Sequence, residues 1–87
     1  MERKPVGRVI HFYPRVSVAV VELSDELKVG DMVSIEGPNG KVEQMVSSMQ
    51  IEHQAVSAAG PGQSVGLKVD GRVREKDVVY KLSHPAE

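Results

Sequence analysis

Four turn-forming residues stand together at positions 37–40, where the chain reads Gly-Pro-Asn-Gly. Short apolar segments lie on both sides, and Asn-Gly supplies the positive φ angles that a tight β-hairpin requires. Similar segments, separated by glycine and proline, follow one another along the chain, and none repeats apolar residues at helical spacing over three turns. The sequence therefore predicts an all-β fold.

The predicted strands span residues 6–13, 16–23, 32–36, 41–51, 64–69 and 77–82, with a further short strand around 55–57. The apolar pattern of 41–51 changes phase near 46–48, which predicts a bulge or bend where the sheet curls. In the polar connector 24–31, Leu27 and Val29 are expected to point inward. Strands this dense predict a barrel or a sandwich, and a closed barrel removes exposed sheet edges. We therefore expect a small closed antiparallel β-barrel of six to seven strands.

The chain has 87 residues, which suits one domain over residues 1–82, and residues 83–87 are expected to form a flexible C-terminal tail. It contains no cysteine, which excludes a disulfide framework and thiolate zinc ligands and is compatible with a reducing compartment. Its longest apolar run, 18–21, is far below the roughly 20 residues of a membrane helix. We expect a cytoplasmic protein that does not contact membranes.

Catalytic motifs are absent from the sequence. Residues 60–66 resemble a dinucleotide-binding loop, but the third glycine is one residue late and Pro61 removes a backbone amide, so we interpret them as a turn before a strand. The histidines, at 11, 53 and 84, do not have the spacing of metal ligands. The sequence therefore predicts a binding module that is not an enzyme and needs no cofactor.

Charge is distributed unevenly, with two basic ends and an acidic middle, although the formal net charge is only −1. If the first and last strands are neighbours, the two basic ends share one side of the molecule; the alternative is that these are ordinary solvated charges. Tyr13 has two readings as well, a single stacking contact for a base or an aromatic cover over the end of the core.

Several segments together resemble domain II of the translational GTPases, namely the connector 27–31, the strand 32–36, the segment 46–53 and the turn 60–66. This resemblance implies a barrel of the elongation-factor type. The same arrangement is similar to the barrel-like C-terminal domain of the U32 peptidase family, whose members include tRNA-modifying proteins. In both families this barrel normally accompanies another domain.

The resemblance to domain II implies a binding face. In the carriers of aminoacyl-tRNA, Gln50 falls where an acidic residue faces the terminal adenosine, and His53 falls near its basic neighbour. We expect a stand-alone, translation-factor-like module that contacts tRNA or ribosomal RNA without catalysis. The alternative is a protein-interaction or scaffold module that docks with a separate GTPase or tRNA-modifying enzyme, a protein partner in translation or tRNA modification, through the acidic middle. The candidate contact residues are Arg8, Arg15, Gln50, His53, Arg72 and Arg74.

Overall fold

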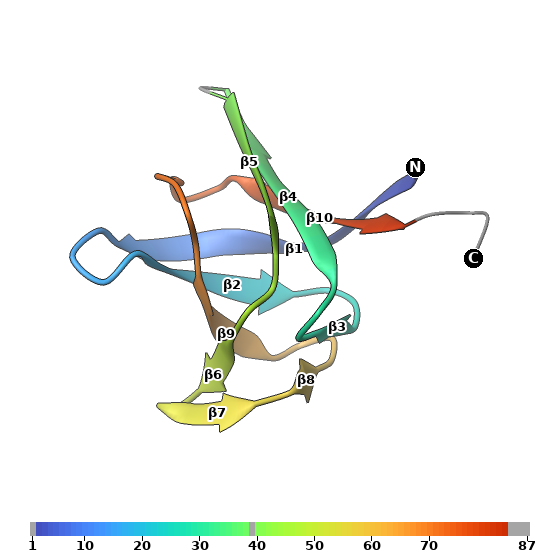
Figure 1. The fold of residues 1–87 in the computed structure, drawn as a ribbon, viewed down its shortest axis with the longest axis vertical. Helices are drawn as coiled ribbons and strands as arrows, with labels where there is room; N and C mark the ends of the chain where they lie inside the picture. The colour runs from blue at the N-terminus through green and yellow to red at the C-terminus, as the bar shows by residue number, and fades with distance from the viewer. Residues whose placement is uncertain (1, 39, 84–87) are drawn as a thin grey trace.

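The computed structural model describes residues 2–38 and 40–83, and these residues form ten strands and no helix (Figure 1). None of them therefore belongs to a helix long and apolar enough to cross a membrane. The predicted all-β class is confirmed. The strands are β1 (Glu2–Tyr13), β2 (Val18–Leu23), β3 (Leu27–Lys28), β4 (Met32–Gly37), β5 (Gly40–Met45), β6 (Met49–Ile51), β7 (Gln54–Val56), β8 (Ala58–Ala59), β9 (Ser64–Lys68) and β10 (Val78–Ser83).

Eight of these strands form one antiparallel sheet in the order β5-β4-β10-β1-β2-β9-β6-β7, and β3 pairs with β8 separately. The ladder differs from the closed one that we expected, because β5 and β7 end it and do not pair with each other. The cause is the predicted bend at 46–48, which splits the expected strand 41–51 into β5 and β6. In Figure 1, β5 crosses in front of β1 and β2 and continues into β6.

A side chain closes part of the gap that the ladder leaves open. The Gln44 amide of β5 donates from Nε2 to the carbonyl of Lys68 at 2.8 Å, and its Oε1 accepts the backbone N–H of Asp70 at 2.6 Å. Gln44 is buried, with 7% of its surface exposed. These two bonds replace the backbone pairing that a closed barrel would have between β5 and the end of β9.

The interior is filled by one cluster of aliphatic side chains. In β2, Ala19 and Val21 point inward, so Val18 and Val20 face outward. Leu27 is fully buried, as predicted, but the prediction for Val29 is wrong, because 41% of its surface is exposed. Its backbone N–H pairs with the carbonyl of Ser57 while the chain turns at Gly30, which leaves the valine side chain outside.

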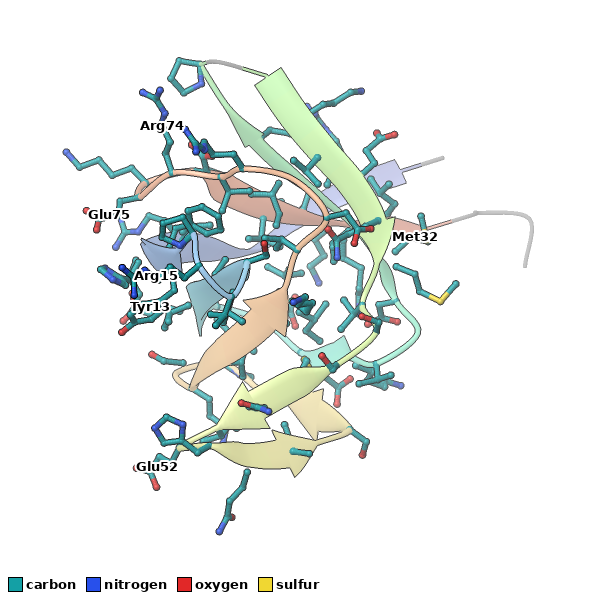
Figure 2. The ribbon with its side chains drawn as sticks, turned by 60° about the vertical axis from the view of Figure 1, so that its left-hand side comes forward. Tyr13, Arg15, Met32, Glu52, Arg74 and Glu75 are labelled. Carbon is teal, nitrogen blue, oxygen red and sulfur yellow. The ribbon has the colours of Figure 1, made fainter. Side chains whose placement is uncertain are left out.

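The two basic ends of the chain come together, because β1 pairs with β10 and also with the loop before it. Val9 accepts the N–H of Lys76 and donates to the carbonyl of Asp77, both at 2.8 Å. Figure 2 shows Arg15 and Arg74 on the same side of the molecule. Apart from the backbone of Ser83, the predicted tail 83–87 lies outside the described residues.

Candidate functional site

A groove of about 670 Å³ lies on the outer face of β2, β9 and β6. Its walls are mostly apolar, and a few polar side chains stand at its edges, which is the usual composition of a ligand site. The residues that line it are Tyr13, Val16, Val18, Val20, Gln50, Glu52, His53, Ser64, Val65 and Gly66.

The floor of the groove is a glycine in the middle of a strand. Gly66 of β9 is the partner of Val20 on one side and of Gln50 on the other, so these three residues form one row across the sheet. Because Gly66 has no side chain, the outer face is hollow at this point. A Cβ placed there would lie 3.3 Å from Cγ1 of Val18 and 3.9 Å from the carbonyl oxygen of Gln50.

One wall of the groove is formed by the connection between β1 and β2. Two hydrogen bonds hold this connection against β9 and the residue that follows it. Lys68 donates from Nζ to the carbonyl of Val16 at 2.9 Å, and the backbone N–H of Val69 bonds to the carbonyl of Ser17 at 2.8 Å. These bonds hold the backbone of Val16, whose side chain is 54% exposed, so this connection presents an apolar residue to solvent.

Of the four described non-glycine residues with a positive φ angle, three lie at or beside the groove, and the fourth, Lys76, lies in the loop before β10. Glu52 and His53 form the two-residue turn between β6 and β7 with φ angles of 51° and 67°, and Ser17 has φ of 55°. Each such residue costs about 1–2 kcal/mol relative to glycine, and a turn of this type normally uses Asn and Gly. Strain of this kind is typical of functional sites.

Tyr13 stands at one end of the groove. Its ring makes an edge contact with His11 at 4.3 Å between centroids, and half of its surface is exposed. The reading of Tyr13 as a cover over the core is therefore wrong, because its neighbour Phe12 points the other way and packs against the core instead. Tyr13 offers an aromatic face to whatever enters the groove.

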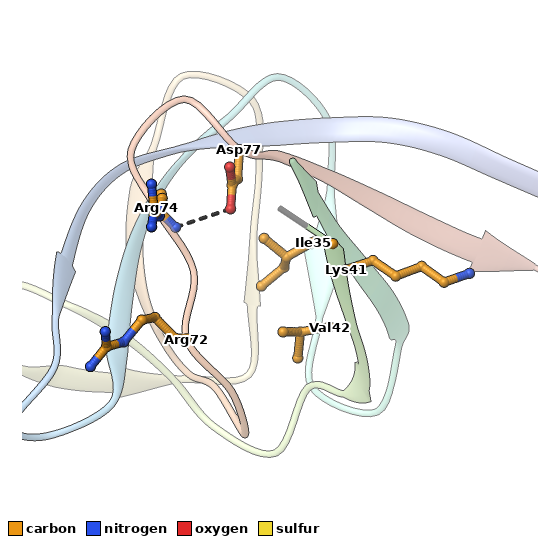
Figure 3. A pocket seen from close by; sticks show the side chains of 7 residues that line it. Ile35, Lys41, Val42, Arg72, Arg74 and Asp77 are labelled. Atoms are coloured by element: carbon orange, nitrogen blue, oxygen red, sulfur yellow. Dashed lines mark hydrogen bonds between the residues drawn. The ribbon is translucent and has the colours of Figure 1, made fainter. Parts of the chain in front are cut away.

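A second hollow, of about 220 Å³, lies between β5 and the loop before β10 (Figure 3). Its cations do not converge, because the side chains of Lys41 and Arg72 point in opposite directions in this view. The carboxylate of Asp77 faces the same space and accepts the backbone N–H of Arg74 at 3.0 Å. This cleft therefore lacks the convergent positive charge that an anion site requires.

The structure separates the six predicted contact residues into three places. Gln50 and His53 line the groove, and Arg72 and Arg74 line the cleft. Arg8 and Arg15 line neither, and Arg8 lies 3.6 Å from Glu22. Their roles as contact residues stay predictions.

Of the residues that line the groove, only Gln50 and His53 were predicted contact residues, and Tyr13 had a stacking reading; the apolar wall and the floor, which include Val18, Val20 and Gly66, were missed. The sequence does not show that Val18 and Val20 point outward, because both faces of β2 carry apolar residues and the alternation of apolar and polar residues is lost. Gly66 did carry a signal, since a glycine inside a strand marks a position where another group approaches the backbone closely.

Resolved pKa shifts occur away from the groove, beside the first strand. The hydroxyl of Ser34 and then the guanidinium of Arg3 hold the pKa of Glu36 below its ordinary value. The Lys4 ammonium lowers the pKa of Asp25 in the same way. Among the described residues, no three side chains of the metal-binding types come together.

The chain is similar to parts of longer proteins named for proteolysis. It is 50% identical over 78 residues to an uncharacterized protease of Methanocaldococcus jannaschii, covering 88% of this chain and 19% of that protein. It is 36% identical over 84 residues to a collagenase of Porphyromonas gingivalis, covering 94% of this chain and 23% of the collagenase. The chain thus spans about a fifth of the length of these relatives. No protein-family model matches it.

The fold matches that of a solved C-terminal domain. The C-terminal domain of a Geobacillus thermoleovorans protein assigned to the U32 peptidases superposes with a TM-score of 0.86, over 92% of this chain and 93% of that domain, at 24% identity. A selenomethionine variant of the same domain gives 0.83 over 87% of this chain. The predicted similarity to the C-terminal domain of the U32 peptidase family is confirmed.

These comparisons correct the functional expectations. The predicted translation-factor-like module that binds RNA, and the alternative of a scaffold for a GTPase or tRNA-modifying enzyme, are wrong, because the relatives are named as protease and collagenase. The expectation of a module that is not an enzyme is contradicted for the same reason, although this chain spans only about a fifth of the relatives that are named for proteolysis. The sequence misled because connector and turn motifs build the barrel, and a barrel does not specify what it binds.

Proposed function

We propose that this chain is the β-domain of a U32-type peptidase and that its groove binds the polypeptide on which the peptidase acts. Two findings support this. The relatives named protease and collagenase match almost the whole chain, and the fold agrees with the C-terminal domain of a U32 peptidase. The groove is the larger of the two hollows described above, and its walls are mainly apolar.

One observation carries the proposal, the row formed by Val20, Gly66 and Gln50. An extended polypeptide offers apolar side chains and backbone amide groups at regular intervals. Val18 and Val20 provide an apolar wall for the side chains, and the exposed amide of Gln50 both donates and accepts hydrogen bonds, as a peptide backbone requires. The bare backbone at Gly66 lets the bound chain approach the sheet.

The dimensions limit the strength of this binding. The distance from β2 across β9 to β6 is two strand spacings, or about 10 Å. A peptide of about three extended residues has this length. A contact of this size lies below the range of stable interfaces, so we expect dissociation constants of about 0.1–1 mM. Linkage to a peptidase domain makes such a weak site useful, because a tethered site works at an effective concentration in the millimolar range.

The resemblance to domain II of the translational GTPases enters this proposal only as a description of the barrel-like fold, and it does not contribute a ligand. The connector at 27–31 and the turn at 60–63 are used here to build and turn the sheet. The connector contributes no residue to the groove, whereas residues 64–66, the end of the motif 60–66, lie in β9 and line it.

The test is the affinity for fluorescein-labelled gelatin peptides, measured by fluorescence polarisation. Gly66→Leu fills the groove, and we expect it to weaken binding about tenfold or more, which corresponds to about 1.4 kcal/mol. Gly60→Leu is the matched control, because a Cβ at Gly60 has only Gln63 Oε1 at 4.0 Å and Gly60 does not line the groove. Equal affinities for the two variants, or no binding by the unmodified chain at millimolar concentration, would sink the proposal.

A further inference from the structure

A second apolar surface lies on the outer face of β1, β10, β4 and β5. Its residues are in register across the strands, since Leu82 is the partner of Met32, Met32 is the partner of Met45, and Pro5 is the partner of Tyr80. We call this surface the terminal patch and define it as Pro5, Met32, Met45, Tyr80 and Leu82.

The terminal patch faces away from the core. Val33 and Val79, the neighbours of its residues along β4 and β10, are 1% and 0% exposed and point inward. Met32 is 39% exposed and Met45 is 57% exposed. Tyr80 and Leu82 are partly buried, and Ser34 and Glu43 continue the row of Tyr80, so the exposed apolar side chains of the patch are those of Pro5, Met32 and Met45. The outer face of such a sheet is ordinarily polar, and exposed apolar side chains on it mark an interaction surface. Methionine is enriched in interfaces because its flexible side chain adapts to a partner.

We propose that the terminal patch docks against the peptidase domain of the protein in which this β-domain works. The inference rests on the proposed function only in taking a peptidase domain as the neighbour. The relatives carry about four fifths of their length outside the matched region, and the Geobacillus domain is C-terminal in its protein. In a protein built in this way, the preceding domain joins at the start of β1.

The point of attachment and the terminal patch coincide. Arg3, near the start of β1, is the partner of Leu82 and so continues the row of Leu82, Met32 and Met45. A domain attached there lies beside the patch without a long linker. Arg3 also forms a polar rim, with its guanidinium 2.5 Å from Glu36 and 4.5 Å from the centre of the Tyr80 ring. An apolar centre with a polar rim is the usual anatomy of an interface.

This docking leaves the groove free. Figure 2 shows Met32 on one side of the molecule and Tyr13 and Glu52, which line the groove, on the other. A peptidase domain bound at the terminal patch therefore does not cover the polypeptide site. The two apolar surfaces then have two different partners.

The experiment measures methionine oxidation by hydrogen peroxide, followed by peptide mass spectrometry. It compares this chain alone with a chimera in which the chain replaces the matched region of the Methanocaldococcus jannaschii protease. Oxidation follows exposure, so Met32 and Met45 should react about tenfold more slowly in the chimera than in the chain alone. Met49, which is 1% exposed, is the internal reference for a protected methionine.

Two variants of the chimera make the result specific. Met45→Lys places a charge in the terminal patch and should restore rapid oxidation of Met32. Gln54→Lys, at a strand position on β7 that is also exposed, should leave Met32 protected.

Equal oxidation rates in chain and chimera overturn the inference. The inference is also overturned if Met32 and Met45 are already protected from oxidation in the chain alone and the protection grows with its concentration. The partner of the terminal patch is then a second copy of this chain. Neither result depends on gelatin binding, so failure of the groove and failure of the patch are distinguished.

Discussion

The side chain of Gln44 should carry more stability than any other single polar group of this domain. Gln44→Met keeps the length of the side chain and removes both of its hydrogen bonds, to the carbonyl of Lys68 and the N–H of Asp70. A hydrogen bond contributes about 0.5–1.5 kcal/mol net, and two partly buried backbone groups lose their partners. We therefore expect a loss of about 1–3 kcal/mol in the free energy of unfolding.

The assay is urea denaturation followed by far-ultraviolet circular dichroism. With a slope of about 1 kcal/mol per molar urea for a domain of this size, the midpoint should fall by about 1–3 M. The control is Gln54→Met on β7, where the side chain is exposed and a change of less than about 0.5 kcal/mol is expected. If the two variants unfold within 0.5 kcal/mol of each other, the hydrogen bonds of Gln44 across the gap between β5 and β9 do not stabilise the domain.

Three further predictions concern other parts of the chain. Ser34→Ala should raise the pKa of Glu36 toward its ordinary value, as read from the carboxyl chemical shift. Because the folded pKa of Glu36 is depressed, its contribution to stability is present above about pH 4.3 and is lost as the pH falls further, so the urea midpoints of the alanine variant and the unmodified chain should converge in acid. Gly37→Ala should destabilise by about 1–3 kcal/mol in the same urea assay, because the added Cβ would displace the carboxylate of Asp77 from the N–H of Arg74, and an unchanged midpoint would contradict this contact. His53→Gly should stabilise by up to about 1–2 kcal/mol by thermal unfolding, because φ of 67° suits glycine; a lower melting temperature would show that the turn is not strained.

Local patterns in the sequence predicted three of the turns correctly and one too short, because the expected link 14–15 spans 14–17 and β2 begins at Val18. The hairpin that pairs Gly37 with Gly40 and the bend at 46–48 are where residue type and phase placed them, because glycine adopts turn conformations closed to other residues and proline fixes its own φ angle; Asn39 lies outside the described residues. The turn at 60–63 is likewise a turn before a strand, with Gln63 bonded to Gly60. These features depend on neighbours in the chain and need no knowledge of the whole fold.

Features that depend on distant contacts were not predictable in this way. Alternation in 16–23 gives two faces but does not say that Ala19 and Val21 are the inner ones. The closing role of Gln44 requires Lys68 and Asp70, more than twenty residues away. The groove depends on the register that sets Gly66 between Val20 and Gln50, and that register is a property of three strands together.

The central claim is that the groove binds an extended polypeptide, and nuclear magnetic resonance tests it most directly. A gelatin peptide is titrated into the ¹⁵N-labelled chain and the amide resonances are followed. We expect saturable chemical-shift changes for the backbone amides of Val20, Gln50 and Gly66. The amide of Met32, on the opposite side of the molecule, should not shift. No shifts at millimolar peptide, or shifts confined to the cleft residues Lys41, Val42, Arg72 and Arg74, would contradict it.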